Sequence, residues 1–299
     1  MHTQRDFINE ICTEENIAIE SLSQGYVLRL TKGTTRRTIY GPYWAINSAA
    51  SDRIACDKCG CYVLLKDSGV PAIPHFLLSH PVKRFGWTGD SGIWSQAIKL
   101  FNAYKTVVAK PNQGSNGNGV QLCENINQLE AAVHSLFAAG ADVAISPFYN
   151  IKNEYRVFYL NGQCHFAYGK TKNPGDWRHN LSQGATAFEL GAGPHYEESS
   201  CAASRRKRKR ALPAVAAGLG AEPHYNKTRL SQLKILASQA AAAIDINFAT
   251  VDVAEFENGE IAIMEINAGV QAKQLLEQLP HLRPIIKDIY ATAIRAMFV

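Results

Sequence analysis

The sequence of 299 residues has no long apolar run. No stretch approaches the ~18 consecutive apolar residues of a transmembrane helix. The first residues, MHTQRDFINEICTEEN, lack the basic and then apolar segments of a secretory signal, so we expect a cytoplasmic protein that does not enter a membrane. Hydrophobic residues make up 46% of the chain and charged residues 19%, which is typical of a folded globular protein.

An excess of one charge is also absent over most of the chain. The net charge is +5, with 31 lysines and arginines against 26 acidic residues, but six of the basic residues form the run RRKRKR at 205–210. Without that run the basic count falls from 31 to 25, which leaves the remainder at −1. The charge therefore disfavours a surface-wide nucleic-acid interface, and a nucleic-acid role would rest on this run alone.

A paired-cysteine framework is not predicted either. The seven cysteines are an odd number, and a chain of this length can bury a core without disulfides. Cys56, Cys59 and Cys61 form the pattern CxxCxC, but a structural zinc site needs a fourth ligand and usually a second CxxC, which does not follow. We interpret these cysteines as small residues at the start of a helix in a protein of a reducing compartment.

Hydrophobic periodicity predicts a mixed α/β (α+β) fold. The expected helices cover residues 52–69, 91–104, 126–139, 230–244 and 283–299. The expected strands cover residues 17–22, 26–33, 105–110 and 142–149, with two hairpins at 154–170 and 250–267 that turn at Asn-Gly pairs. Asp52 is the expected N-cap of the first helix, and Gly69 is its expected end.

Residues 197–226 interrupt this pattern. The string GAGPHY at 191–196 recurs as GAEPHY at 220–225, and between the two lie the basic run and an Ala/Gly/Pro-rich stretch. Such a composition predicts an inserted surface loop, because it supplies no packed core and lengthening a loop costs little free energy. A nuclear-import signal or a polyanion-binding arm is the functional alternative.

Two carboxylates and an amide fall on the second hairpin. Glu265 and Asn267 alternate on one strand and therefore project to the same face, and Asp252 on the preceding strand would face the same cavity. Oxygen ligands of this kind suit Mg²⁺. The alternative is an exposed polar face, although an acid within such apolar runs would need a partner or a metal.

Lys110 ends a predicted strand and is followed at once by a loop with Gly114, Gly117 and Gly119. Glycine lets backbone amides approach a polyphosphate, and a neighbouring lysine adds a positive charge. The loop is not a Walker A motif, because no GK[ST] follows, and glycine-rich hairpin turns are common. The pattern therefore leaves a phosphate loop and an ordinary turn as alternatives.

The segment DWRHNLSQGA, which begins at Asp176, indicates an anion clamp. Arg178 and Asn180 alternate and would face one side of a strand, where a guanidinium fork binds a carboxylate or a phosphate. His179 would point the other way, as a structural or solvent-facing residue. Lys170 and Lys172 would extend the anion site.

Together these segments resemble the ATP-grasp superfamily, and within it the carboxylate–amine ligases. The matching strings are VVAKPNQGSNGNGV, ISPFYNIKNEYRVFYLNGQ, GDWRHNLSQGA, VDVAEF and MEINAGV, and the resemblance extends over residues 52–280. The segment NSAASDRIACDKCGCYVLLKDSGVPAIP is similar to the start of the grasp region in cyanophycin synthetases and bifunctional glutathione synthetases. GDWRHNLSQGA is also similar to the ribosomal-protein glutamate ligases and the lysine-biosynthesis ligases.

The resemblance implies an ATP-grasp fold in which two α+β subdomains grip ATP, preceded by a small N-terminal α/β module. It implies that Lys110 contacts the ATP phosphates and that a loop with Gly114, Ser115, Asn116, Gly117 and Gly119 closes over them. Lys58 is the candidate for an earlier nucleotide-contacting lysine, and Lys170 is a further candidate for binding the nucleotide. The resemblance implies an adenine hinge of Ser146, Phe148 and Tyr149, with Glu154 at the ribose. It implies catalytic roles at the γ-phosphate and acyl phosphate for Arg178 and Asn180. It implies two Mg²⁺ ions, with Mn²⁺ as an alternative, on Asp252, Glu265 and Asn267.

Two departures from the family pattern concern this site. Many relatives carry an acid before the hinge aromatic, where this chain has Pro147. Because that acid is missing here, Glu154 becomes the more important candidate for the ribose contact. The insertion at 197–226 lies where relatives are short, and it would narrow or cover the substrate entrance.

The implied activity is ADP-forming ligation of a carboxylate to an amine through an acyl phosphate, with an amino acid or a peptide as substrate. The alternative is a non-catalytic nucleotide-binding or regulatory protein on the same scaffold, which the three metal-ligand candidates disfavour. The expected domains are an N-terminal module with a linker (1–88), a central subdomain (89–175) and a C-terminal subdomain (176–299) that contains the inserted loop. A homodimer agrees with the family, but no residue pattern decides the oligomeric state.

Overall fold

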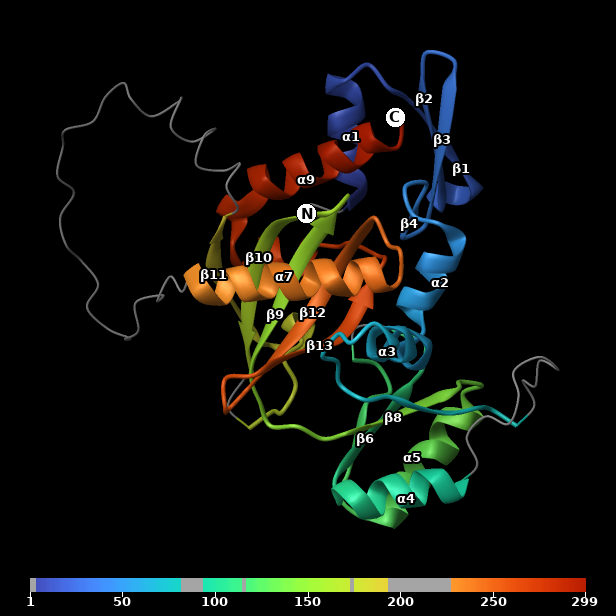
Figure 1. The fold of residues 1–299 in the computed structure, drawn as a ribbon. Coiled ribbons are helices and arrows are strands. Elements are labelled where there is room, and N and C mark those ends of the chain that lie inside the picture. The colour runs from blue at the N-terminus through green and yellow to red at the C-terminus, as the bar shows by residue number, and fades with distance from the viewer. Residues whose placement is uncertain (1–3, 82–93, 115–116, 173–174, 193–226) are drawn as a thin grey trace.

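The computed structural model describes residues 4–81, 94–114, 117–172, 175–192 and 227–299, and its strands form three sheets (Figure 1). The predicted mixed α/β class is confirmed. The whole predicted inserted loop (197–226), with its basic run, lies outside the described residues, as do Ser115 and Asn116.

The N-terminal region is one helix packed on a four-stranded antiparallel sheet. Its elements are α1 (Gln4–Glu14), β1 (Ala18–Leu22), β2 (Val27–Lys32), β3 (Thr35–Tyr40) and β4 (Tyr43–Trp44). Alternation along β2 buries Leu28 and Leu30 against Phe7 and Ile11 of α1. The sequence predicted β1 and β2 but not α1, β3 or β4.

Two helices, α2 (Ala49–Cys56) and α3 (Lys58–Asp67), replace the single helix predicted over residues 52–69. Ser48, not Asp52, caps α2, because its Oγ accepts from the Ser51 amide at 3.0 Å. Asp57 separates the two helices and is the N-cap of α3, because its side chain accepts a hydrogen bond from the Gly60 amide at 2.7 Å. Asp52 lies buried inside α2, where the Asn47 amide donates to it.

The third sheet has the strand order β5-β8-β6-β7 and packs one face on two helices. Its elements are β5 (Phe76–Leu78), α4 (Trp94–Tyr104), β6 (Val107–Pro111), β7 (Gln121–Cys123), α5 (Ile126–Ala138) and β8 (Val143–Pro147). Ile145 belongs to the core under these helices, so its neighbour Ser146 faces the opposite side.

The five-stranded sheet has the order β11-β10-β9-β12-β13. Its strands are β9 (Ile151–Leu160), β10 (Gln163–Thr171), β11 (Thr186–Ala192), β12 (Phe248–Phe256) and β13 (Ile261–Asn267). The helices around it are α7 (Lys227–Ala243), α8 (Lys273–Gln278) and α9 (Arg283–Ala296). A 3₁₀ turn (Pro280–Leu282) joins α8 to α9, and another (Leu181–Gln183) precedes β11. Both predicted hairpins are confirmed, and Asn161 and Gly162 take the positive φ of a primed turn.

Strand alternation gives this sheet two different faces. One face carries Val157 and Val251 and packs on α7, which crosses it in Figure 1. The other face carries Phe158 and Phe248, which pack toward α9 and α1. Toward the start of β9 and the middle of β12, this second face carries the charged residues Glu154, Arg156 and Asp252, which line a cavity together with residues of the third sheet. In Figure 1 the third sheet lies below the five-stranded sheet.

The three sheets do not coincide with the three predicted domain ranges, because two of the sheets contain strands from more than one range. The third sheet takes β5 from the range 1–88, and the five-stranded sheet takes β9 and β10 from the range 89–175. Sheet pairing does not itself define domain limits, so the ranges 1–88, 89–175 and 176–299 remain predictions.

Candidate functional site

A cavity of about 500 Å³ lies between the third sheet and the five-stranded sheet. That volume falls within the ~300–1,000 Å³ of small-molecule sites. Nearly all described residues that the sequence singled out line it: Lys58, Lys110, Gly114, Gly117, Ser146, Phe148, Tyr149, Glu154, Lys170, Arg178, Asn180, Asp252, Glu265 and Asn267. Gly119 does not line it; at φ +70° it packs against Pro111 and Leu136, which gives it a role in the turn.

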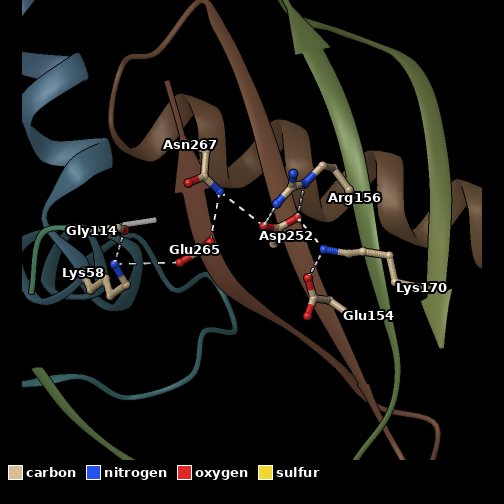
Figure 2. Close-up of polar contacts among 8 residues, drawn as sticks. All are labelled: Lys58, Gly114, Glu154, Arg156, Lys170, Asp252, Glu265 and Asn267. Carbon is tan, nitrogen blue, oxygen red and sulfur yellow. Dashed lines mark hydrogen bonds and ion pairs between the residues drawn. The ribbon is translucent and has the colours of Figure 1, made fainter. Parts of the chain in front are cut away.

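The register of the sheet assembles the polar wall of the cavity. Asp252 pairs with Arg156 on one side and with Glu265 on the other, and Lys170 pairs with Glu154. Residues directly opposite on antiparallel strands have side chains ~5 Å apart. Figure 2 shows the result, a continuous series of polar contacts from Glu154 to Gly114.

Asp252 is at the centre of this series. Arg156 donates to both of its oxygens, Nε to Oδ1 at 2.7 Å and Nη2 to Oδ2 at 2.6 Å, and the Lys170 ammonium is 3.6 Å away. Burial opposes ionisation of this carboxyl, but the two cations outweigh it and hold its pKa at about 2. Lys170 also donates to Glu154, so no ribose partner is needed to explain that buried acid; its ribose contact remains a prediction.

The three candidate metal ligands lie together. Asn267 Nδ2 donates to Asp252 Oδ2 and to Glu265 Oε1, each at 3.2 Å. A half-turn of that amide exchanges nitrogen for oxygen at the same place and gives the all-oxygen donor set that suits Mg²⁺. Among the described residues no three His, Cys, Asp or Glu side chains form a metal cluster, so the set depends on the amide.

The Lys110 ammonium has no partner among the described residues. No hydrogen bond or ion pair joins its ammonium to any residue that the structure describes, whereas Lys58 donates to the Gly114 carbonyl at 2.9 Å and lies 3.9 Å from Glu265. Burial lowers the pKa of Lys110 to about 8. A desolvated and unpaired ammonium is suited to an anion that enters the cavity.

The predicted anion clamp is not a strand. Residues 176–180 form an irregular segment ahead of a 3₁₀ turn, and Asp176 receives two bonds from the Arg178 side chain, at 3.2 and 3.1 Å. His179 was expected to point away from Arg178 and Asn180, as a structural or solvent-facing residue. That direction is wrong, because without strand alternation His179 lines the cavity beside them. It is 3% exposed, which excludes the solvent-facing alternative, and a structural role stays a prediction. The Trp177 ring packs edge-on against Phe148 of the hinge, with 5.8 Å between the two ring centroids.

The glycine-rich loop reaches the clamp. Gly117 has φ +70°, and a Cβ at this position would lie 2.1 Å from Asn180 Nδ2. The positive φ favours glycine, and any larger residue would also force the Asn180 amide to move.

Several cavity residues were not found from the sequence. Arg156 is the most important of them, and the signal was present, because it alternates with Glu154 within the apolar strand EYRVFYL. Two further residues, His75 and Trp177, were also missed. They belong to segments without a regular hydrophobic pattern, so the sequence does not predict which way their side chains point.

The sequence family described as RimK-like ATP-grasp domain matches residues 55–207 of this chain, which is just over half of it. The chain belongs to this family. The matched range includes the lysines, the glycine-rich loop, the hinge and the clamp. No curated protein matches the chain in sequence.

Solved ATP-grasp proteins share the fold at low identity. The D-alanine–D-alanine ligase of Bacillus anthracis in complex with ATP aligns with a TM-score of 0.54 and 15% identity over 84% of this chain and 70% of that one. The D-cycloserine synthetase DcsG gives 0.51 and 18% over 82% and 71%. The D-alanine–D-alanine ligase of Coxiella burnetii gives 0.51 and 12% over 82% of this chain, which spans 59% of that ligase.

No helix among the described residues combines the length and the apolar character needed to cross a bilayer.

Proposed function

We propose that this chain is an ATP-dependent ligase that joins a carboxylate to an amine with formation of ADP. The observation that carries the proposal is the cavity wall itself. Lys110 of the third sheet lines the same cavity as Asp252, Glu265 and Asn267 of the five-stranded sheet, and Gly114, Gly117 and Arg178 line it too. The membership in the ATP-grasp family supports the same conclusion.

The proposed reaction has two steps. A carboxylate oxygen of the first substrate attacks the γ-phosphorus of ATP, and the bond to ADP breaks, which gives an acyl phosphate. The amine of the second substrate then attacks the acyl carbon and displaces phosphate. Overall a carboxylate, an ammonium and ATP give an amide, ADP, hydrogen phosphate and one proton, so atoms and charge balance.

The chain's own residues bind and orient the reactants. Lys110 and Arg178 hold phosphate oxygens where negative charge develops, and the backbone near Ser146 and Tyr149 holds the base. The approach of Gly117 to Asn180 closes the loop over the reacting groups and excludes water, which protects the acyl phosphate from hydrolysis. Magnesium bound at Asp252, Glu265 and Asn267 would neutralise charge on the phosphate oxygens.

Residues outside the predicted nucleotide and metal sites are the candidates for substrate contacts. Tyr43, Arg53, Gln271 and Gln274 are such residues, and all four line the cavity. Arg53 offers a guanidinium for a carboxylate, and the two glutamines offer donors and acceptors, which suits amino acids or short peptides. Single amino acids, pairs of them and short peptides are therefore the first substrates to test.

The test measures phosphate release from MgATP across that panel, and mass spectrometry searches each reaction for a product one water lighter than the two substrates combined. We expect product only when two substrates are present. Lys110→Met should abolish it, and Lys99→Met, which removes an exposed lysine of α4, should not. ATP binding without turnover across the panel would favour the non-catalytic alternative.

A further inference from the structure

His75 is a buried imidazole with one free nitrogen. The residue is 5% exposed and lines the cavity, and its Nδ1 lies 2.9 Å from the Ile73 carbonyl. A carbonyl oxygen can only accept a hydrogen bond, so Nδ1 carries the proton and Nε2 bears a lone pair. Nε2 has no hydrogen-bond partner among the described residues.

The surroundings of His75 keep the imidazole neutral. Burial lowers its pKa well below 6.5, and the cations of Lys110 and Lys58 lower it further. Nε2 is therefore an acceptor and not a donor at neutral pH. An unsatisfied acceptor in a buried site costs free energy that a ligand donor can recover.

The strand register places this acceptor beside the hinge. Phe76 of β5 pairs with Ile145 of β8, and His75 and Ser146 are the next residues on either side of this antiparallel pair. Ser146 pairs with Val108, two residues before Lys110 on β6. Ile145 faces the helix side, so His75, Ser146 and Lys110 share the cavity side.

We propose that His75 determines the nucleobase specificity of the site, with Nε2 accepting a hydrogen bond from the exocyclic 6-amino group of adenine. This inference rests on the proposed nucleotide site. The hinge side chains Ser146, Pro147, Phe148 and Tyr149 include no acid that would accept from an amino group. Guanine presents a carbonyl oxygen at the same place, and two acceptors that face each other repel, so the site excludes GTP.

The test compares dissociation constants of MgATP, MgGTP and the magnesium complex of purine riboside triphosphate, which lacks the 6-amino group. Wild-type protein should bind MgATP at least ~10-fold more tightly than the other two, the size of one lost hydrogen bond that leaves a polar group unpaired. His75→Phe keeps a planar ring without an acceptor. It should weaken MgATP binding by a similar factor and bring the three nucleotides to within about twofold of each other.

His75→Gln provides a second readout, because its amide can donate as well as accept. This variant should gain affinity for MgGTP relative to wild type while it retains affinity for MgATP. Thermal unfolding of both variants checks that the fold is intact. The two substitutions together separate a hydrogen bond to the base from a change in packing.

Two outcomes would overturn the inference. An unchanged preference for MgATP in folded His75→Phe would mean that Nε2 serves only the protein, for example through a water in the adjoining cavity of about 10 Å³. The inference alone fails if Lys110→Met still weakens MgATP binding in that case. Absence of any nucleotide binding by wild-type protein would overturn the inference together with the proposed function.

Discussion

Replacing Arg156 by methionine tests whether the charged wall of the cavity is held together by the Arg156–Asp252 pair. Methionine keeps much of the aliphatic volume but removes both hydrogen bonds, at 2.7 and 2.6 Å. The Asp252 side chain is only 2% exposed, so water cannot replace the lost partner. Breaking one side of a buried pair costs ~3–5 kcal/mol.

The magnitude should lie near the lower end of that range, because Lys170 remains 3.6 Å from Asp252 and Asn267 still donates to it. We therefore expect the free energy of unfolding to fall by about 3 kcal/mol at pH 7. Adding Asp252→Asn removes the carboxylate charge that Arg156→Met leaves unpaired. The double variant should therefore be at least ~1 kcal/mol more stable than the summed free-energy losses of the two single variants predict.

The pH dependence has a defined sign. The pKa of Asp252 is lowered to about 2, so its contribution to stability is complete above its ordinary pKa and is lost as the pH falls toward 2. Without the Arg156 guanidinium the pKa of Asp252 should rise. As the pH is lowered, the Arg156→Met variant should therefore begin to lose stability at a higher pH than the wild-type protein does.

The assay is urea unfolding followed by tryptophan fluorescence, which gives both the free energy and its denaturant slope. Arg29→Met is the matched control, because Arg29 and Glu20 form a pair at 2.8 Å with side chains 42% and 54% exposed. This control should cost less than ~1 kcal/mol. An equal effect of the two substitutions, or simple additivity in the double variant, would refute the reasoning.

Three further predictions concern the proposed reaction. Because the pKa of Lys110 is about 8, MgATP binding measured by titration calorimetry should weaken ~10-fold per pH unit above 8, and Lys110→Arg should remove this dependence. Gly117→Ala should lower kcat/KM for ATP by ~10-fold or more through its clash with Asn180, whereas Gly140→Ala, at a similar φ in open space, should leave steady-state kinetics unchanged. Glu265→Gln should abolish ADP formation with an unchanged melting temperature; near-full turnover would contradict the metal assignment.

Much of the fold was predictable from local patterns. The hairpins at Asn161-Gly162 and Asn258-Gly259 appear as predicted. Both residues of the first turn take a positive φ, and Gly259 takes one in the second, which are positions that Asn and Gly tolerate. The split between α2 and α3 was missed because Asp57 sits within a continuous apolar periodicity. Strand β11 and helix α8 were also missed; β11 is stabilised by pairing with β10, which is a tertiary contact.

The sequence predicted which residues belong to the candidate site more fully than it predicted the contacts among them. Lys110, Asp252 and Glu265 were identified by residue type and position, and the structure brings them to one cavity. Their partners depend on register: Arg156 faces Asp252 because β9 and β12 pair at that step, and a shift of one residue would send it to the α7 side. The direction of His179 was wrong because residues 176–180 have no strand alternation.

Isotope transfer tests the central claim most directly. The substrate panel is run with carboxylic acids labelled with ¹⁸O in the carboxylate, and the released phosphate and nucleotide are examined by mass spectrometry. The account predicts one ¹⁸O in inorganic phosphate for each amide formed, with unlabelled ADP as the other product. Label in AMP, or turnover of ATP with no label in phosphate, would contradict an acyl-phosphate ligase at this cavity.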